Sequence, residues 1–286
     1  YNLIGSLLGI ILFIILSFFW TPPSVWILIS FLIFLVLNYK NKQKNLFSAF
    51  CVIIMAIFLS SSMKDNKQTI YSPYQNISIE YLTTPLNPII MQTSHLFYQA
   101  LLNLSEDLKF TQRERSPGNI FGYNIDVDHE REFYDIPYKI KTEKIEKILI
   151  VGSGAGNDVA AANRYNIKNI TAVEIDPVIA DIGIKYHPEA PYANNSVKLV
   201  IDDARSFIKS SKDKYDTIIY GLLDSQTNLS SKGGIRLDSY VFTLEAFEEA
   251  KNSLSEEGFL YLSFFVQTPE LGFKLFKMLE KTFDEK

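Results

Sequence analysis

The chain has 286 residues, of which 47% are apolar, and a formal net charge of −4 at pH 7. This slightly acidic balance gives no indication of nucleic-acid binding, and the single cysteine, Cys51, excludes an intramolecular disulfide. The charges are unevenly distributed, because Lys40, Lys42 and Lys44 are the only charged side chains before Lys64. The composition therefore predicts a membrane segment followed by a soluble one.

Residues 1–63 contain three apolar runs, from Leu3 to Trp20, from Thr21 to Leu37 and from Leu46 to Met63. A helix needs roughly 20 apolar residues to cross a bilayer, so each run is near the required length. Buried core helices or a cleaved signal are the alternatives, but a signal peptide is single and begins with basic residues. We expect three transmembrane helices, the first two joined tightly at Thr21-Pro22-Pro23 because proline cannot continue a helix.

Residues 64–140 are expected to form a small β-containing subdomain. The stretch from Thr69 to Leu82 is rich in Ile, Tyr and Thr, which predicts a strand or a hairpin. The stretch from Asn87 to Leu104 changes from a strand-like to a helix-like pattern, and Asp126 to Lys141 leads into the next unit.

Residues 141–286 alternate between strand-like and helix-like patterns, which predicts βαβ units around a parallel sheet and a doubly wound α/β fold. Helix-like stretches include Asp158 to Tyr165 and Leu244 to Leu254. The predicted strands are Lys147 to Val151, Ile170 to Glu174, Val197 to Ile201, Thr217 to Tyr220 and Phe259 to Phe265.

A glycine-rich turn follows the first of these strands. Gly152, Gly154 and Gly156 precede a predicted helix, so the backbone can turn sharply and approach a ligand without interference from a Cβ atom. Glu174 ends the next strand, where a carboxylate can accept hydrogen bonds from two ribose hydroxyls. The alternative is a tight turn without a ligand, with Glu174 a solvated strand end.

A second acidic position follows the third predicted strand at Asp203-Ala204. The Asp203 carboxylate could accept a hydrogen bond from an adenine amino group, but Asp202 or Asp203 could equally cap the next helix. The turn, Glu174 and Asp203 together predict a nucleoside site.

The segments GSGAGND, AVEIDP, DDARSFI and YDTIIYGLLDS, together with SPYQ upstream, occur in this order. They resemble the spermidine synthase group of class I methyltransferase-like proteins, especially bacterial members fused to membrane segments, from about residue 70 to about residue 265. The resemblance implies a Rossmann-like domain that binds decarboxylated S-adenosylmethionine, or S-adenosylmethionine itself. It assigns the nucleoside to Gly152, Gly154, Gly156, Glu174 and Asp203, with Asp202 and Ala204 beside the adenine.

The family reaction transfers an aminopropyl group from a sulfonium to an amine. The amine must lose a proton, since its ammonium form has a pKa near about 10, and a carboxylate can assist that loss. Asp224 matches the catalytic aspartate of the family, Tyr74 and Gln75 match its Tyr-Gln pair, and Tyr134 aligns with its conserved tyrosine. We assign Asp224, Tyr74 and Tyr134 to catalysis and Gln75 to the cosubstrate, whereas a turn cap and core aromatic residues are the alternatives.

Three departures from the family pattern concern charge. Ala155 and Gly221 stand where the family carries acids that bind cationic amines, and Asp135 replaces a histidine. These changes argue against orthodox spermidine synthesis, and intact S-adenosylmethionine could be accepted instead. The polar stretch from Ser225 to Gly234 could be a lid or a long loop, and Arg236 could hold an anion or be solvated.

The end of the chain also departs from the expected fold, because only one further helix, from Pro269 to Lys281, is predicted after the last strand. A methyltransferase-like sheet normally ends with an antiparallel strand pair. Since the chain also starts with Tyr1, we expect it to be trimmed at both ends. The three histidines have no metal-ligand spacing, so no metal site is predicted, and surface or packing roles are expected for His95, His129 and His187.

Three hypotheses follow for function: a membrane-anchored transferase of this family, an S-adenosylmethionine-dependent methyltransferase, or an inactive subunit of a membrane complex. The expected partners are a small-molecule substrate such as an amine, the membrane, and complex subunits or a second copy. Lys40, Lys42 and Lys44 would place the soluble domain outside, whereas Lys64 and Lys67 argue the reverse. A nucleotide-derived cosubstrate favours a multi-pass membrane protein with a cytoplasmic soluble domain.

Overall fold

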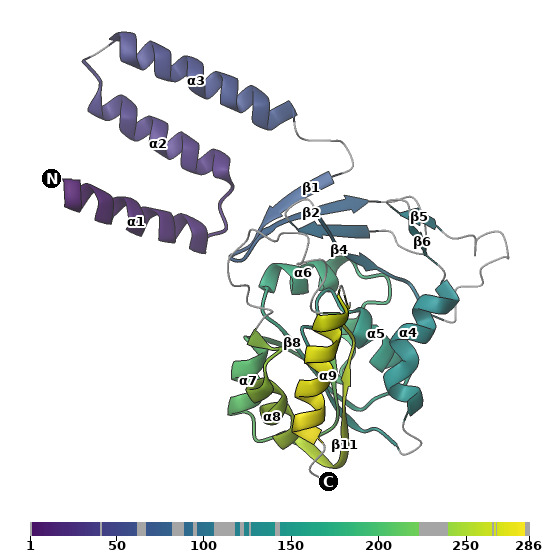
Figure 1. The fold of residues 1–286 in the computed structure, drawn as a ribbon. Helices are drawn as coiled ribbons and strands as arrows, with labels where there is room; N and C mark the ends of the chain where they lie inside the picture. Colours follow the sequence, from purple (N-terminus) through teal and green to yellow (C-terminus); the bar gives the residue numbers. More distant parts are fainter. Residues whose placement is uncertain are drawn as a thin grey trace. The chain divides into compact units, whose positions relative to one another are not determined.

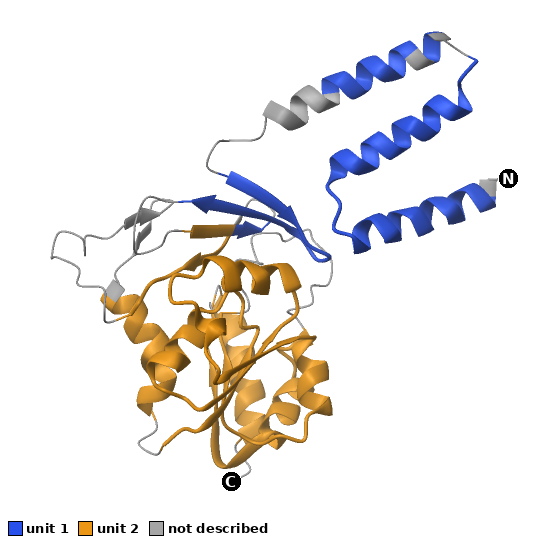
Figure 2. Cartoon of the chain, turned by 180° about the vertical axis from the view of Figure 1, so that it is seen from behind, with its two compact units in different colours: residues 1–81, 92–95 blue, residues 82–91, 96–286 orange. Residues whose placement is uncertain are grey.

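The structure is a computed structural model in which the chain divides into two compact units, one comprising residues 1–81 and 92–95 and the other residues 82–91 and 96–286 (Figure 2). The described residues are 2–40, 42–61, 67–81, 89–93, 96–105, 118–120, 123–125, 127–140, 144–222, 240–264, 266 and 268–283.

The first unit begins with three helices, α1 (Asn2–Phe18), α2 (Pro23–Leu37) and α3 (Lys42–Ser61) (Figure 1). Pro23 occupies the first position of α2, where its missing N–H costs nothing because that group has no partner inside a helix. The Thr21 hydroxyl fastens the connection between α1 and α2, since it donates to the Leu16 carbonyl (2.8 Å) and accepts from the Trp26 indole (2.6 Å).

The prediction of membrane-spanning helices, and with it the multi-pass membrane localisation, is wrong. In the part of the chain that the structure describes, no helix combines the length and the apolar character needed to cross a bilayer. The reason is length in two cases, because α1 has 17 residues and α2 has 15, against roughly 20 for a span. Helix α3 has 20 residues but opens with the polar run from Lys42 to Asn45.

Short strands follow. Strands β1 (Lys67–Tyr71) and β2 (Asn76–Tyr81) pair antiparallel, which confirms the predicted hairpin. The Ser72 hydroxyl accepts from the backbone N–H groups of Tyr74 (3.1 Å) and Gln75 (2.9 Å) and so fixes the turn. The remaining strands before the parallel sheet are β3 (Ile89–Thr93), β4 (Leu96–Leu101), β5 (Gly118–Ile120) and β6 (Tyr123–Ile125).

The helix-like interpretation of residues 96–101 is therefore wrong. This segment is strand β4, whose Phe97 and Tyr98 have the aromatic side chains that favour extended backbone. The segment leading into the second half of the chain is instead a helix, α4 (Val127–Ile140), which carries Pro137 in its interior.

Five parallel strands form the central sheet in the order β11-β10-β7-β8-β9. This arrangement confirms the doubly wound α/β fold. The strands are β7 (Lys147–Val151), β8 (Asn169–Glu174), β9 (Val197–Ile201), β10 (Tyr215–Tyr220) and β11 (Leu254–Leu262). The connecting segments are α5 (Asn157–Arg164), α6 (Pro177–Tyr186), the short 3-10 helix η1 (Pro191–Ala193), α7 (Ala204–Ser210), α8 (Leu244–Asn252) and α9 (Pro269–Phe283).

Both faces of this sheet are covered, which explains why β7 is apolar from Ile148 to Val151 (Figure 1). Leu149 and Val151 pack in a core with residues of α7, α8 and α9. Ile148 and Ile150 point to the opposite face and pack in a core with residues of α4 and α5. Full burial of each such side chain contributes roughly 1.5 to 3 kcal/mol.

The strand order also locates the site. The chain proceeds from β7 to β8 and β9 on one side, then returns to place β10 and β11 on the other side of β7. The carboxyl ends of β7 and β10 therefore form the point where the strand order reverses, which is where ligands bind in open α/β sheets.

Candidate nucleoside-binding site

The glycine-rich turn between β7 and α5 depends on backbone conformations that other residues rarely adopt. Gly152, Gly154 and Gly156 have φ angles of 64°, 57° and 107°. A Cβ atom on Gly156 would also lie 2.6 Å from the Pro191 side chain. Glycine is therefore required at Gly156 both by conformation and by the close approach of η1.

Glu174 ends strand β8 and points at this turn. One carboxylate oxygen accepts from the Gly154 N–H (2.8 Å) and the other accepts from the Asp176 N–H (2.9 Å). The side chain is only 4% exposed, and burial raises its pKa to about 7. Each oxygen retains a second lone pair, so the carboxylate can still accept from ligand hydroxyls at the edge of the turn.

Two further residues hold the turn, and neither was predicted from the sequence. The Gln99 amide oxygen accepts from the Ala155 N–H (3.0 Å), and a Cβ atom on Gly154 would lie 2.9 Å from that oxygen. The Tyr192 hydroxyl donates to the Gly154 carbonyl (2.7 Å). No local sequence signal could have identified them, because these contacts join segments far apart in the chain.

Asn157, the first residue of α5, lies at the centre of a buried polar network behind the turn. Its side-chain N–H groups donate to the Ala100 carbonyl (2.9 Å) and the Tyr134 hydroxyl (3.0 Å). Its oxygen accepts from the Leu102 N–H (3.3 Å) and lies 3.0 Å from His187 Nε2. The network thus fixes the predicted catalytic Tyr134 against α5.

His187 is neutral in this network. Burial, and after it the charge of Arg164, lowers its pKa to about 3. Nδ1 accepts from the Glu189 N–H (3.2 Å), so the proton resides on Nε2, which donates to the Asn157 oxygen. The predicted packing role of His187 is therefore confirmed.

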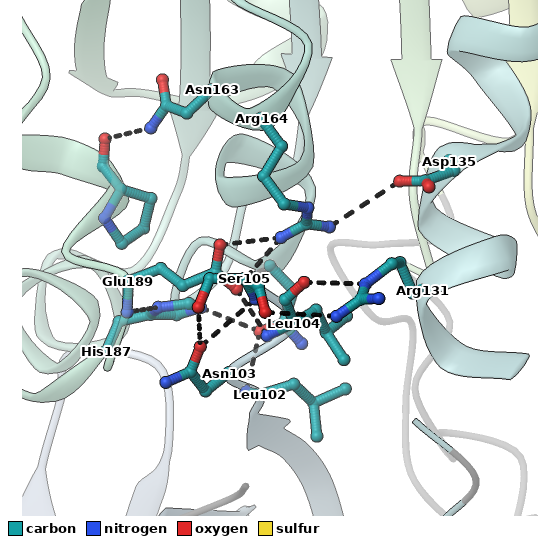
Figure 3. Close-up of polar contacts among 12 residues, drawn as sticks. Leu102, Asn103, Leu104, Ser105, Arg131, Asp135, Asn163, Arg164, His187 and Glu189 are labelled. Atoms are coloured by element: carbon teal, nitrogen blue, oxygen red, sulfur yellow. Dashed lines mark hydrogen bonds and ion pairs between the residues drawn. The ribbon is translucent and has the colours of Figure 1, made fainter. Parts of the chain in front are cut away.

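A cluster of charged side chains fastens the segment after β4 to α4 and α5 (Figure 3). Glu189 accepts from Arg164 (2.8 Å) and from the Leu104 N–H (2.7 Å), while Arg131 donates to the Leu104 carbonyl (2.9 Å). Asp135, the residue in place of the family histidine, lies 3.9 Å from Arg164. Asp135 is buried, and its carboxylate forms part of this charged cluster.

Asp203 caps helix α7, as one of the two interpretations predicted, because its carboxylate accepts from the Ser206 N–H (2.8 Å). Ala204 is buried as the first residue of that helix. The neighbouring Asp202 N–H donates to the Glu174 carbonyl (3.1 Å), so residues 202–204 start at the same sheet edge as Glu174.

The side chain of Asp158, from the helix that follows β7, lies at the carboxyl end of β10. A Cβ atom on Gly221 would lie 2.7 Å from the carboxylate of Asp158, the second residue of α5. Burial raises the pKa of the Asp158 carboxyl to about 6, although its own backbone N–H and Arg164 act in the opposite direction.

The remaining predicted residues belong to the other compact unit or lie outside the described residues. Tyr74 and Gln75 lie in the β1–β2 turn, which belongs to the other compact unit. Asp224, the stretch from Ser225 to Gly234, and Arg236 lie outside the described residues. Among the residues that are described, no group of three or more His, Cys, Asp or Glu side chains could hold a metal ion.

The switch-point turn, the acidic end of β8 and the covered parallel sheet define a Rossmann-like domain of the methyltransferase type. A model of the spermine/spermidine synthase domain matches residues 132–285. The chain belongs to the spermine/spermidine synthase family. The family predicted from the sequence motifs is thus confirmed.

Individual relatives agree with this assignment. A polyamine aminopropyltransferase from Sulfurisphaera tokodaii is 35% identical over 119 residues, which cover 40% of this chain and 37% of that protein. A polyamine aminopropyltransferase from Buchnera aphidicola is 35% identical over 146 residues, which cover 49% of this chain and 48% of that protein. The chain therefore spans less than half the length of these relatives.

Solved structures show the same fold. A spermidine synthase in complex with the transition-state analogue AdoDATO superposes with a TM-score of 0.51 at 17% identity, covering 76% of this chain and 64% of that one. The spermidine synthase from Thermotoga maritima gives 0.50 at 16% identity, with the same coverage. At these identities the likeness concerns the fold alone.

Proposed function

We propose that this chain binds decarboxylated S-adenosylmethionine at the β7–α5 turn and transfers its aminopropyl group to an amine. The observation that carries the proposal is the Glu174 carboxylate, which is buried, held by two backbone N–H groups and directed at the glycine turn at the switch point of the sheet. An acid in that place accepts hydrogen bonds from ribose hydroxyls. Family membership and the relatives named as polyamine aminopropyltransferases support the same reaction.

The hydrogen bonds of the turn favour a ligand without phosphate groups. Sites for phosphate offer free backbone N–H groups to the anion. Here the N–H groups of Ser153, Gly154, Ala155 and Gly156 are all used inside the protein, by Val173, Glu174, Gln99 and Ser153 respectively. A sulfonium nucleoside needs no such donors, whereas the pyrophosphate of a dinucleotide does.

The proposed reaction is a direct displacement. The lone pair of the acceptor amine attacks the aminopropyl carbon bonded to sulfur, the carbon–sulfur bond breaks, and its electron pair neutralises the sulfonium to give methylthioadenosine. The proton lost by the amine passes to a carboxylate, and the family pattern assigns that role to Asp224. Tyr74, Gln75, Tyr134, Asp203 and Ala204 remain proposed site residues on the same grounds.

A methyltransferase that uses intact S-adenosylmethionine is the second candidate. It is favoured by Ala155, which is fully buried and uncharged where the family carries an acid. No carboxylate at that position would repel the carboxylate of the intact donor.

Calorimetry with decarboxylated S-adenosylmethionine, S-adenosylmethionine and methylthioadenosine separates the candidates. We expect the decarboxylated donor to bind more tightly than the intact one. The reverse preference would favour the methyltransferase, and no binding of any of the three would contradict both.

The same ligands can be used to test the catalytic role of Asp224. Asp224→Asn should abolish aminopropyl transfer while leaving donor affinity unchanged, because the amide cannot take up the proton from the amine. Asp181→Asn, an exposed aspartate on α6, is the matched control and should retain full activity. Turnover that survives in Asp224→Asn would remove this residue from the mechanism.

A further inference from the structure

Asp158 and Gly221 meet at the switch point of the parallel sheet. Strands β7 and β10 are neighbours, with Val151 paired to Tyr220, so the segments that follow them leave the same edge side by side. Asp158 comes from the β7 side and Gly221 directly follows β10. The Asp158 carboxylate oxygen lies 2.7 Å from the position that a Cβ atom of residue 221 would take.

The backbone does not require glycine at residue 221. The described glycines with positive φ are Gly152, Gly154 and Gly156, so Gly221 has a conformation that other residues adopt readily. What the structure excludes is a side chain on residue 221, because the Asp158 carboxylate occupies that space. A carboxylate is therefore present at this edge although residue 221 carries no side chain.

In the described part of the chain, the Asp158 carboxylate has no ion-pair partner, although the charge of Arg164 favours its ionised form. No described basic side chain forms an ion pair with it, and no described neighbour donates a hydrogen bond to it beyond its own backbone N–H. Arg164, on the same helix, instead pairs with Glu189 (2.8 Å). A half-buried carboxylate without a counter-charge is costly to keep ionised, which makes a cationic ligand favourable there.

The charge of the Asp158 carboxylate acts on four tyrosine hydroxyls. Burial, and after it the charge of Asp158, raises the pKa of the Tyr134, Tyr138 and Tyr261 hydroxyls, so all three lie within its field. Asp158 acts on Tyr192 in the same direction, after the larger effects of burial and Glu174. These hydroxyls therefore remain neutral and supply no counter-charge to the carboxylate.

We propose that Asp158 binds the primary ammonium group of the substrate pair, in place of the carboxylates that Ala155 and Gly221 do not supply. This inference rests on the proposed aminopropyl transfer. Two groups share this chemistry, the aminopropyl ammonium of the donor and a terminal ammonium of the acceptor amine. Asp158 is a substrate-binding residue in this proposal and takes no part in proton transfer.

The test compares ligands that differ by the ammonium group. Asp158→Asn keeps the shape of the side chain and removes its charge. Methylthioadenosine carries no ammonium, so its affinity should be unchanged in this variant. The affinity of the variant should fall about ten- to a hundredfold for one of two ligands. These are decarboxylated S-adenosylmethionine and 1,4-diaminobutane added with methylthioadenosine. The ligand whose affinity falls carries the ammonium group that Asp158 binds. Asp181→Asn, an exposed aspartate on α6, should alter neither.

A carboxylate swap separates charge recognition from a structural role of Asp158 at the start of α5. Asp158→Ala alone should lose ammonium affinity as Asp158→Asn does. Asp158→Ala combined with Gly221→Asp vacates the space and returns a carboxylate from the other strand, so it should recover most of that affinity. Gly221→Asp alone should bind poorly, because two carboxylates would collide.

The outcomes also separate this inference from the proposed function. If the unaltered protein binds neither methylthioadenosine nor the decarboxylated donor, the proposed function fails and the role of Asp158 fails with it. If the unaltered protein binds these ligands and Asp158→Asn binds every ammonium ligand equally well, only the role of Asp158 is overturned. A folded swap variant no better than Asp158→Ala would overturn it as well.

Discussion

The two sides of strand β7 each carry a carboxylate with a raised pKa, but the two acids have different surroundings. On the β8 side, both oxygens of Glu174 accept backbone N–H groups, so this acid helps to build the turn. On the β10 side, the Asp158 carboxylate lies against the backbone of Gly221 and has no ion-pair partner among the described residues. A raised pKa therefore does not show what an acid binds. The two backbone donors hold Glu174 in place for the ribose hydroxyls of the proposed nucleoside, whereas Asp158, in our proposal, binds an ammonium group.

The largest effect is expected from a substitution in the glycine-rich turn, which lies between the two acids. Gly156→Ala introduces a Cβ atom 2.6 Å from Pro191 at a residue with φ of 107°, so we expect a loss of at least about 3 kcal/mol in the free energy of unfolding, measured in urea. Gly5→Ala, in helix α1 with nothing within 4 Å of its new Cβ, should not destabilise the protein. A stable Gly156→Ala variant would contradict the packing of η1 against the turn.

The second largest effect is expected from a substitution of Glu174, on the β8 side. Glu174→Gln replaces an acceptor by an amide NH2 that must face a backbone N–H, so one buried donor loses its partner at a cost of about 1 to 3 kcal/mol. Affinity for methylthioadenosine should fall by about a hundredfold, in contrast to Asp158→Asn, which should leave it unchanged. Calorimetry measures the methylthioadenosine affinity of both variants, and Glu248→Gln, on the exposed face of α8, is the control. Equal losses in the two variants would remove the distinction between the two sides.

The smallest expected effect concerns pH and the network behind the turn. The pKa of His187 is about 3 in the folded protein and ordinarily about 6.5, so the unfolded chain gains a proton first as the pH falls. His187 therefore costs stability below pH 6.5, at most about 1.4 kcal/mol per pH unit. The raised pKa values of Glu174 and Asp158 act in the opposite direction, because the folded protein then holds their protons.

Comparison with His187→Gln isolates this contribution. Relative to that variant, the unaltered protein should lose about 2 kcal/mol of unfolding free energy between pH 7 and pH 5, measured by urea denaturation. His129→Gln, on the exposed side of α4, should show the same pH dependence as the unaltered protein. An identical pH dependence of the His187→Gln variant would show that the histidine is not held neutral.

The parallel sheet could be predicted closely from the sequence. The bounds of β7 and β9 agree with the predicted strands from Lys147 to Val151 and from Val197 to Ile201, because both segments are mainly apolar and β-branched and end at a turn. The same reasoning failed for residues 96–101, where a short apolar stretch fits helix or strand and pairing with other strands decides. The domain boundaries at residues 63 and 140 remain a prediction.

The apolar N-terminal helices show a second limit of composition. Runs of apolar residues near the length of a span suggested membrane helices, but α1 and α2 are shorter than their runs, and α3 begins in a polar stretch. Where a helix begins and ends depends on local capping and on the prolines at residues 22 and 23, and a shift of a few residues decides whether about 30 Å can be crossed.

By itself, the sequence determined the family, the α/β fold and the glycine turn at which we propose the nucleoside site, because strand periodicity, a glycine turn and an acid at a strand end are local features of the chain. Only the tertiary structure decided what the individual polar groups do. It brought Gln99 and Tyr192 onto the turn, assigned Asp203 to a helix cap and placed the carboxylate of Asp158 in the space left by Gly221. The reason is physical: hydrogen bonds and steric exclusion act over a few ångströms in space, between residues that no spacing in the sequence connects.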